Sequence, residues 1–324
     1  MTALVTAFFL GGTIGMAGHQ GGVVTRLGAD QLVDSVPALG ELDVELDVRN
    51  FRSLPSANLS FEDVVELTRA AEGCEADGVV VVQGTDTLEE TAYLIDLLWP
   101  LDTPIVVTGA MRNPSMAGSD GPANLLAAVQ VAASRAFGGL GALVVLNDQI
   151  HAARFVRKTH STSTATFASP NAGPIGLVAE GRPVRVVTVE RRPVHRPRAL
   201  DARVALHVVS MGDDGGTLDR IAERCDGLVV GALGVGHVPE RLGEVLVDLA
   251  RTIPVVLASR TGAGPVLTAT YGFVGSETYL LGHGLISAGL LDPYKARVLL
   301  TVALDCGYDT DRIRSAFADA SATT

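Results

Sequence analysis

The residues that decide the fold are GVVVVQ at 78–83 and the sequence GTDTLEETAYLIDLLW that follows at 84–99. The first stretch is a nearly continuous apolar run, which is typical of a strand buried on both faces of a parallel sheet. The second stretch opens with a polar turn and continues with apolar residues at helical spacing, which predicts a helix over 88–99. A strand followed by a turn and a helix is the repeating unit of a parallel sheet covered by helices.

The same unit recurs on both sides of this stretch. Upstream and downstream of it we predict strands at 3–10, 43–51, 104–108 and 142–147 and helices at 28–36, 61–71 and 119–137. After residue 202 the pattern resumes, with strands at 204–209, 227–232 and 254–259 and helices near 217–224, 240–251, 295–305 and 311–320. The sequence therefore predicts an α/β protein whose ligands bind at the loops that follow the strands.

One segment interrupts this rhythm. Residues 190–202 (ERRPVHRPRALDA) contain two prolines and four arginines, a composition typical of a connection between domains. We therefore expect a larger N-terminal parallel-sheet domain over 1–189, a linker over 190–202, and a smaller C-terminal α/β domain over 203–324.

Composition narrows the possible partners and the compartment. The 324 residues carry a net charge of −11, which argues against nucleic-acid and anionic-membrane partners. Apolar runs are interrupted well before the ~20 residues that a transmembrane helix needs, and the N-terminus lacks the cationic start of a secretory signal. Three widely spaced cysteines (Cys74, Cys225, Cys306) indicate free thiols in a reducing cytoplasm, with disulfide or metal ligation as the less favoured alternative.

Lysine is scarce in this chain. It has 23 arginines but only two lysines, Lys158 and Lys295. Arginine replaces lysine readily on a solvated surface, but it cannot give up its proton as a lysine can. The two remaining lysines are therefore candidates for proton chemistry.

Three post-strand loops carry residues suited to such chemistry. Thr13 follows two glycines after the first strand, where it is either an exposed nucleophile or an ordinary turn residue. The glycine-rich residues 16–24 that follow form either a mobile lid over the site or a flexible loop. In the next loop, Thr87 and Glu90 fit a helix capping box, which leaves Thr85 and Asp86 to be explained. Asp86 alone is equally explained as an acid at a helix N-terminus.

The third loop holds Lys158, within RKTHST at 157–162. A lysine next to Thr85 and Asp86 would act as a general base, because the carboxylate holds the amine while the amine takes the proton of the hydroxyl. A solvated loop lysine is the alternative.

Other motifs are absent. The glycines of GALGVG at 231–236 are in the wrong order for a dinucleotide-binding loop, and no phosphate-binding loop occurs. The histidines and acids lack metal-ligand spacing, and G-x-S-x-G is missing. We therefore expect no metal and no cofactor.

Seven short motifs occur along the chain in this order: GGTIG, QGTDTLEETAY, VTGAMR, SDGPANL, LND, RKTHSTSTATF and YKARVLL. Together they resemble the bacterial-type L-asparaginase family, from Leu10 to Leu300. The resemblance implies a larger N-terminal and a smaller C-terminal α/β domain. It also implies hydrolysis of L-asparagine to L-aspartate and ammonia, without metal or cofactor.

Carried onto this sequence, the resemblance implies a role for each matching residue. Thr13 is the nucleophile that forms the acyl-enzyme, and Thr85, Lys158 and Asp86 are the proton-transfer triad. Backbone N–H groups near Thr85 and Ala110 form the oxyanion hole. Two further substrate contacts are implied: Asp86 with the α-ammonium group, and Ser53 near the α-carboxylate. In the family, an acidic residue of a neighbouring subunit also reaches into the site, and Glu277 matches it. His237 stands where many members have an asparagine.

The resemblance also implies a homodimer or homotetramer with its site at a subunit interface. Two departures stand out: no tyrosine precedes Tyr93, although many members have one in the lid, and Leu54 replaces a glutamine. A glutaminase or mixed-specificity enzyme is the first alternative. An amidotransferase subunit and a non-catalytic amino-acid-binding protein are the less favoured ones.

Overall fold

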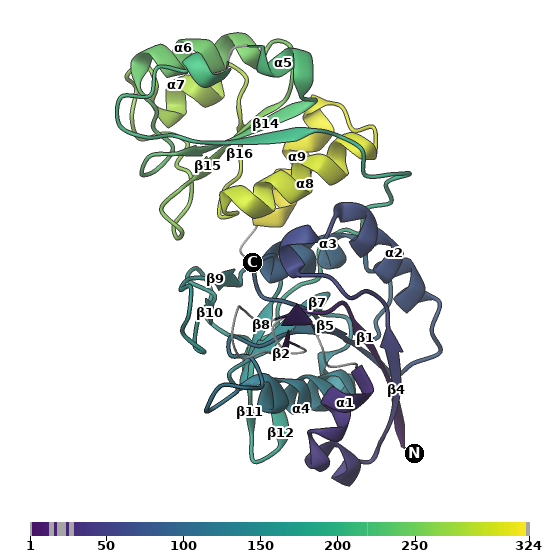
Figure 1. Ribbon diagram of the computed structural model, residues 1–324. Coiled ribbons are helices and arrows are strands. Elements are labelled where there is room, and N and C mark those ends of the chain that lie inside the picture. Colours follow the sequence, from purple (N-terminus) through teal and green to yellow (C-terminus); the bar gives the residue numbers. More distant parts are fainter. Residues whose placement is uncertain (1, 13–15, 18–23, 26–28, 219, 322–324) are drawn as a thin grey trace. The chain divides into compact units, whose positions relative to one another are not determined.

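The computed structural model describes residues 2–12, 16–17, 24–25, 29–218 and 220–321. The chain divides into two compact units, Met1–Val194 and His195–Thr324 (Figure 1). This division falls within the predicted linker, whose bounds at 190 and 202 stay a prediction. Thr13, the predicted nucleophile, lies outside the described residues, as does most of the predicted lid.

The first unit is built on one eight-stranded sheet with the order β12-β11-β8-β7-β6-β5-β1-β4. Five neighbouring strands are parallel: β4 (Val44–Asn50), β1 (Ala3–Phe9), β5 (Gly78–Val82), β6 (Ile105–Thr108) and β7 (Ala142–Leu146). All five residues of β5 are buried, as its apolar run predicts. The α/β fold class predicted from the sequence is confirmed.

Three further strands extend the sheet in antiparallel fashion, and the sequence did not predict them. They are β8 (Gln149–Ala152), β11 (Gly176–Ala179) and β12 (Arg182–Arg185). Two small hairpins stand apart from the sheet: β9 (Arg157–Lys158) with β10 (Phe167–Ala168), and β2 (Met16–Ala17) with β3 (Val24–Thr25). Strands of two to four residues are too short to give the apolar periodicity from which strands are recognised.

Helices cover both faces of this sheet, as Figure 1 shows. The elements are α1 (Ala29–Asp34), α2 (Phe61–Glu72), α3 (Leu88–Leu98) and α4 (Gly121–Ala132), with short 3-10 turns at Pro37–Glu41, Ser56–Asn58 and Arg135–Phe137. Helices α2 and α3 lie on one face, whereas α4 packs on the other face against β5, β6 and β7. The buried core beneath α4 brings together Val80, Val82, Val106 and Leu125.

One predicted helix cap is wrong. Thr87 is the N-cap residue of α3, but its side chain accepts no capping hydrogen bond from the helix. Its backbone ψ of 13° departs from the extended conformation of an ordinary N-cap, and its hydroxyl donates to the carbonyl oxygen of Ser56 at 3.0 Å. A complete capping box occurs at α2 instead, between Ser60 and Asp63.

The second unit contains a parallel four-stranded sheet with the order β13-β14-β15-β16. Its elements are β13 (Val204–Val208), a 3-10 turn at Gly216–Leu218, α5 (Ile221–Arg224), β14 (Gly227–Ala232), α6 (Glu240–Leu249), β15 (Val255–Ser259), α7 (Glu277–Gly282), β16 (Ile286–Ser287), α8 (Pro293–Asp305) and α9 (Thr310–Ser321). The short elements α7 and β16 were not predicted. No helix within the described part of the chain is long and apolar enough to cross a membrane.

Candidate active site

The loop that follows β5 presents Thr85 and Asp86 at the carboxyl end of the sheet. Thr85 is buried, with 5% of its surface exposed, whereas two-thirds (67%) of the Asp86 side chain is exposed. A buried hydroxyl beside an exposed carboxylate combines a group shielded from water with a group open to a ligand.

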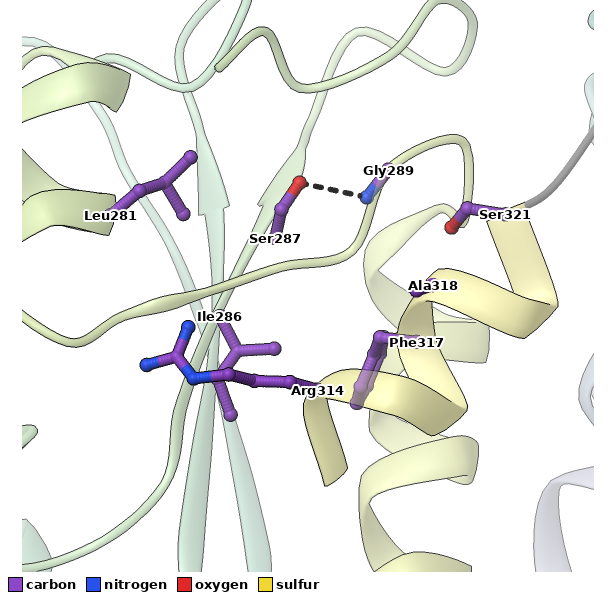
Figure 2. A pocket seen from close by; sticks show the side chains of 8 residues that line it. All are labelled: Leu281, Ile286, Ser287, Gly289, Arg314, Phe317, Ala318 and Ser321. Atoms are coloured by element: carbon purple, nitrogen blue, oxygen red, sulfur yellow. Dashed lines mark hydrogen bonds between the residues drawn. The ribbon is translucent and has the colours of Figure 1, made fainter. Parts of the chain in front are cut away.

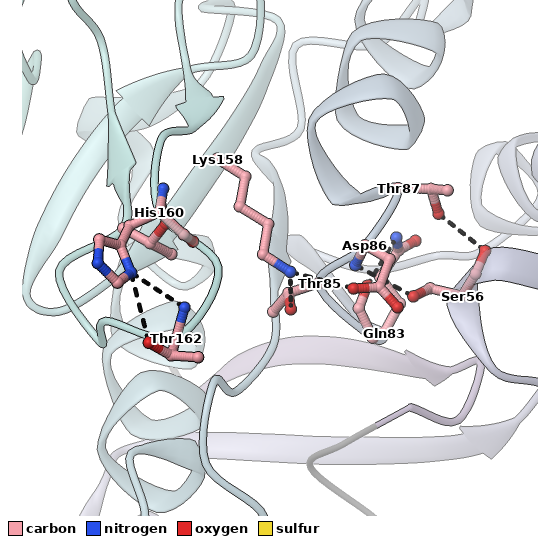
Figure 3. A network of polar contacts seen from close by, with 10 residues as sticks. Ser56, Gln83, Thr85, Asp86, Thr87, Lys158, His160 and Thr162 are labelled. Carbon is pink, nitrogen blue, oxygen red and sulfur yellow. Dashed lines mark hydrogen bonds and ion pairs between the residues drawn. The ribbon is translucent and has the colours of Figure 1, made fainter.

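Ser56 holds this loop in place. Its hydroxyl accepts a hydrogen bond from the backbone N–H of Asp86 at 3.2 Å, and its carbonyl oxygen accepts the hydroxyl of Thr87 (Figure 3). Ser56 is 2% exposed. The predicted residue Ser53 is exposed, and its backbone lies beside Gly11. Sequence reasoning missed Ser56, although both serines occur in the same motif, SLPSAN.

The segment that follows β1 contacts the same loop at a glycine, Gly12. Gly12 has a φ of +94°, and a Cβ atom added to it would lie 2.1 Å from the backbone nitrogen of Gly84. Only glycine permits this conformation and this approach. The residue that follows in the sequence is Thr13, so the β1 segment leading to it lies against the Thr85–Asp86 loop.

Lys158 approaches the loop from the β9–β10 hairpin. Its Nζ donates to Thr85 Oγ1 at 3.0 Å and forms an ion pair with Asp86 Oδ1 at 3.1 Å (Figure 3). The Lys158 side chain is 17% exposed. The structure thus brings three of the four predicted catalytic residues into direct contact.

The loop after β6 packs against Thr85. A Cβ atom added to Gly109 would lie 3.3 Å from Thr85 Cγ2, and the next residue, Ala110, is fully buried. Asp120 is the N-cap residue of α4, but its side chain makes no capping hydrogen bond with the helix; its carboxylate accepts the backbone N–H groups of Met111 and Arg112 at 3.0 and 2.8 Å. Asp120 therefore shapes the loop that presents Ala110.

Glu277 and His237 lie together in the second unit. Glu277 is fully buried, and its carboxylate accepts the backbone N–H groups of Thr270 and Tyr271 and contacts His237 Nε2 at 3.1 Å. Burial alone would raise the pKa of Glu277, but these hydrogen bonds outweigh it and lower the pKa. The sequence-based role of Glu277 at a neighbour's site stays a prediction.

Lys295 differs from Lys158 in its surroundings. Its side chain is fully buried, and Nζ lies 3.0 Å from Asp292, the N-cap residue of α8. Lys295 therefore links a helix cap to the core of the second unit.

A hollow of about 340 Å³ lies in the second unit (Figure 2). Its lining includes Ile286, Phe317 and Arg314, and none of the predicted site residues. The guanidinium of Arg314 donates hydrogen bonds to the carbonyl oxygens of Gly284 and Leu285. Within the described ranges, no three histidine, cysteine or acidic side chains are grouped so as to hold a metal ion.

Comparison with known proteins covers nearly the whole chain. Residues 4–191 match the family described as "Asparaginase, N-terminal", and residues 203–317 match the "Glutaminase/Asparaginase C-terminal domain". A probable L-asparaginase of Deinococcus radiodurans is 38% identical, with 92% of this chain and 95% of that protein aligned. L-asparaginase 2 of Escherichia coli is 33% identical over 97% of this chain and 92% of its own.

The fold has a close structural counterpart. The crystal structure of a probable cytoplasmic L-asparaginase from Campylobacter jejuni superposes with a TM-score of 0.87 at 30% identity, covering 98% of this chain and 99% of the other. The likeness therefore extends over both units of the chain.

Proposed function

The chain belongs to the bacterial-type L-asparaginase family, and we propose that it hydrolyses L-asparagine to L-aspartate and ammonia through a covalent acyl-enzyme on Thr13. One observation carries this proposal: the contacts of Lys158 Nζ with Thr85 Oγ1 and Asp86 Oδ1, at 3.0 and 3.1 Å. A hydroxyl, an amine and a carboxylate in this order form a path for a proton. Family membership supports asparaginase chemistry at the same place.

In the proposed reaction, Thr13 Oγ adds to the carbon of the substrate's side-chain amide. The hydroxyl proton passes by way of Thr85 to Lys158, which Asp86 holds in place, and from Lys158 to the departing nitrogen. Ammonia leaves as the C–N bond breaks. Water then cleaves the acyl-enzyme, which releases aspartate and returns the proton to Thr13. Support for Thr13 comes from its sequence neighbour Gly12, which packs on Gly84.

The substrate would be held by groups around this path. The exposed carboxylate of Asp86 suits the α-ammonium group, because the two opposite charges can pair at the surface and neither ion has to be buried alone. We propose backbone N–H groups near Thr85 and Ala110 for the oxyanion that develops on the amide oxygen. Ser53 remains the proposed partner of the α-carboxylate.

Glutamine is the alternative substrate. The C-terminal match is to a domain description that names both glutaminase and asparaginase. Ammonia release from asparagine and from glutamine, measured side by side at equal enzyme concentration, decides between them. A Thr13→Ala variant measured in the same assay tests the acyl-enzyme: we expect activity to fall by about 10³-fold or more, as for loss of a covalent nucleophile.

We further propose a homodimer or homotetramer in which Glu277 and His237 of one subunit complete the site of another. The three cysteines are all free, which supports a reducing, cytoplasmic location. Sedimentation velocity tests the assembly, and cell fractionation tests the location.

A further inference from the structure

Lys158 is held by its main chain as well as by its ammonium group. Its backbone N–H donates to Glu89 Oε2 at 3.1 Å. Glu89 is the second residue of α3, the helix that begins just after the Thr85–Asp86 loop, and it is 8% exposed. One short segment, residues 85–89, therefore contacts both ends of Lys158.

The hairpin geometry explains why this N–H group can reach Glu89. In an antiparallel pair, opposing residues alternate between hydrogen-bonded and non-hydrogen-bonded pairs. Thr159 donates its N–H to the carbonyl oxygen of Thr166, so the adjacent pair, Lys158 and Phe167, is the non-hydrogen-bonded one. The N–H of Lys158 consequently points away from β10, on the side where Glu89 accepts it.

We propose that Glu89 is a positioning residue for Lys158: its carboxylate fixes the backbone from which the ammonium group extends to Thr85 and Asp86. This inference rests on the proposed role of Lys158 in the reaction. Strands β9 and β10 have only two residues each and are separate from the main sheet. A pairing this short is marginal by itself, so a hydrogen bond to a side chain outside the hairpin restrains it appreciably.

A simpler explanation is that Glu89 only stabilises the N-terminus of α3, as an acid does in a first helical turn. The chain offers a matched control. Glu62 is the second residue of α2 and an exposed acid in its first turn. If helix electrostatics were the whole role, removal of either glutamate would have a similar effect.

The first experiment compares four variants by asparagine turnover: Glu89→Ala, Glu89→Gln, Glu89→Asp and Glu62→Ala. We expect Glu89→Ala to lower kcat by about 10- to 100-fold, the cost of slight misplacement of a reacting group, with KM within about threefold. Glu89→Gln keeps an oxygen acceptor at the same reach and should restore most of the activity. Glu89→Asp keeps the charge but withdraws the acceptor by one methylene, so it should resemble Glu89→Ala.

The second experiment uses the scarcity of lysine. Protein labelled with ¹⁵N- and ¹³C-lysine gives signals from only two residues, Lys158 and Lys295. We expect Glu89→Ala to shift the backbone amide and ¹³Cε signals of Lys158 and to leave those of Lys295 unchanged. The Lys295 signals thus show in the same sample that the second unit is folded.

The outcomes separate the inference from the proposed function. Wild-type kcat and unshifted Lys158 signals in Glu89→Ala would overturn the positioning role, as would equal losses in Glu89→Gln and Glu89→Ala. Because Glu89→Gln preserves the buried contact, it remains informative if Glu89→Ala does not fold. Full activity of Lys158→Ala would overturn the proposed triad itself, whatever the Glu89 variants do.

Discussion

Lys158 Nζ donates to the hydroxyl of Thr85 at 3.0 Å, across 73 positions of sequence. We expect Lys158→Arg to be nearly as inactive as Lys158→Ala, because an arginine keeps the ion pair with Asp86 but cannot release its proton. Both variants should lower kcat for asparagine by about 10²- to 10⁴-fold, the usual worth of general acid–base catalysis. An arginine variant with more than half of wild-type kcat would show that Lys158 acts only as a positive charge.

Ser53 and Ser56 differ in what their removal should change. Ser56→Ala deletes the acceptor of the Asp86 N–H, so we expect it to lower the free energy of unfolding by about 1 kcal/mol as well as kcat/KM. Ser53→Ala should leave stability unchanged and raise KM about tenfold if Ser53 binds the α-carboxylate. Thermal unfolding and steady-state kinetics on both variants check this. An unchanged KM in Ser53→Ala would remove Ser53 from the substrate site.

The sequence predicted the scaffold better than the side chains that shape the site. Buried strands such as β5 were recognised because a short run of β-branched valines that ends at a glycine turn is typical of a strand buried on both faces. Hairpin β9–β10 was missed because two residues per strand carry no periodicity. The Lys158–Thr85 contact could not be derived from spacing alone, since that hairpin brings the two residues together.

Residues with an ordinary local explanation were the ones that the sequence misassigned or passed over. Thr87 and Glu90 fitted a capping box, but backbone geometry at Thr87 directs its hydroxyl to Ser56. Glu89 is a typical first-turn acid, so nothing local indicates that it accepts a hydrogen bond from Lys158. Both contacts join segments far apart in the chain, and only tertiary structure reveals them.

The approach of Gly12 to Gly84 makes a strong prediction about stability. In Gly12→Ala the new methyl group would meet backbone at 2.1 Å, in a conformation with φ of +94° that alanine avoids. We expect a loss of more than about 3 kcal/mol in the free energy of unfolding. Gly40→Ala is the control, because a Cβ atom there meets nothing within 4 Å. Comparable stabilities for the two variants would contradict the close contact.

Two titrating groups of the first unit should drive its stability in opposite directions with pH. Burial raises the pKa of Asp96 to about 6, although the N–H of Ala142 and the charges of Arg154 and Arg191 oppose the rise. Burial lowers the pKa of His151 to about 4. Between pH 4 and 6 the folded state therefore holds a proton on Asp96 that the unfolded chain has released. Over nearly the same range the unfolded chain holds a proton on His151 that the folded state lacks.

The sign of each contribution follows from this difference in bound protons. The contribution of Asp96 to the free energy of unfolding is present at low pH and is lost as pH rises from about 4 to 6. The His151 contribution is present above pH 6.5 and is lost as pH falls toward 4. Each amounts to about 3 kcal/mol, at 1.36 kcal/mol per pKa unit. The two largely cancel in the wild-type protein.

Single substitutions should expose the two slopes. Relative to wild type, the free energy of unfolding of Asp96→Asn should rise by about 3 kcal/mol as pH rises from 4 to 6. That of His151→Gln should fall by about as much, relative to wild type, as pH rises from 4 to 6.5. Urea unfolding at several pH values measures both, followed by the fluorescence of Trp99, the only tryptophan, which is buried next to α3 in the same unit. The double variant should show little pH dependence relative to wild type. Parallel slopes for the two single variants would show that burial does not shift these pKa values in opposite directions.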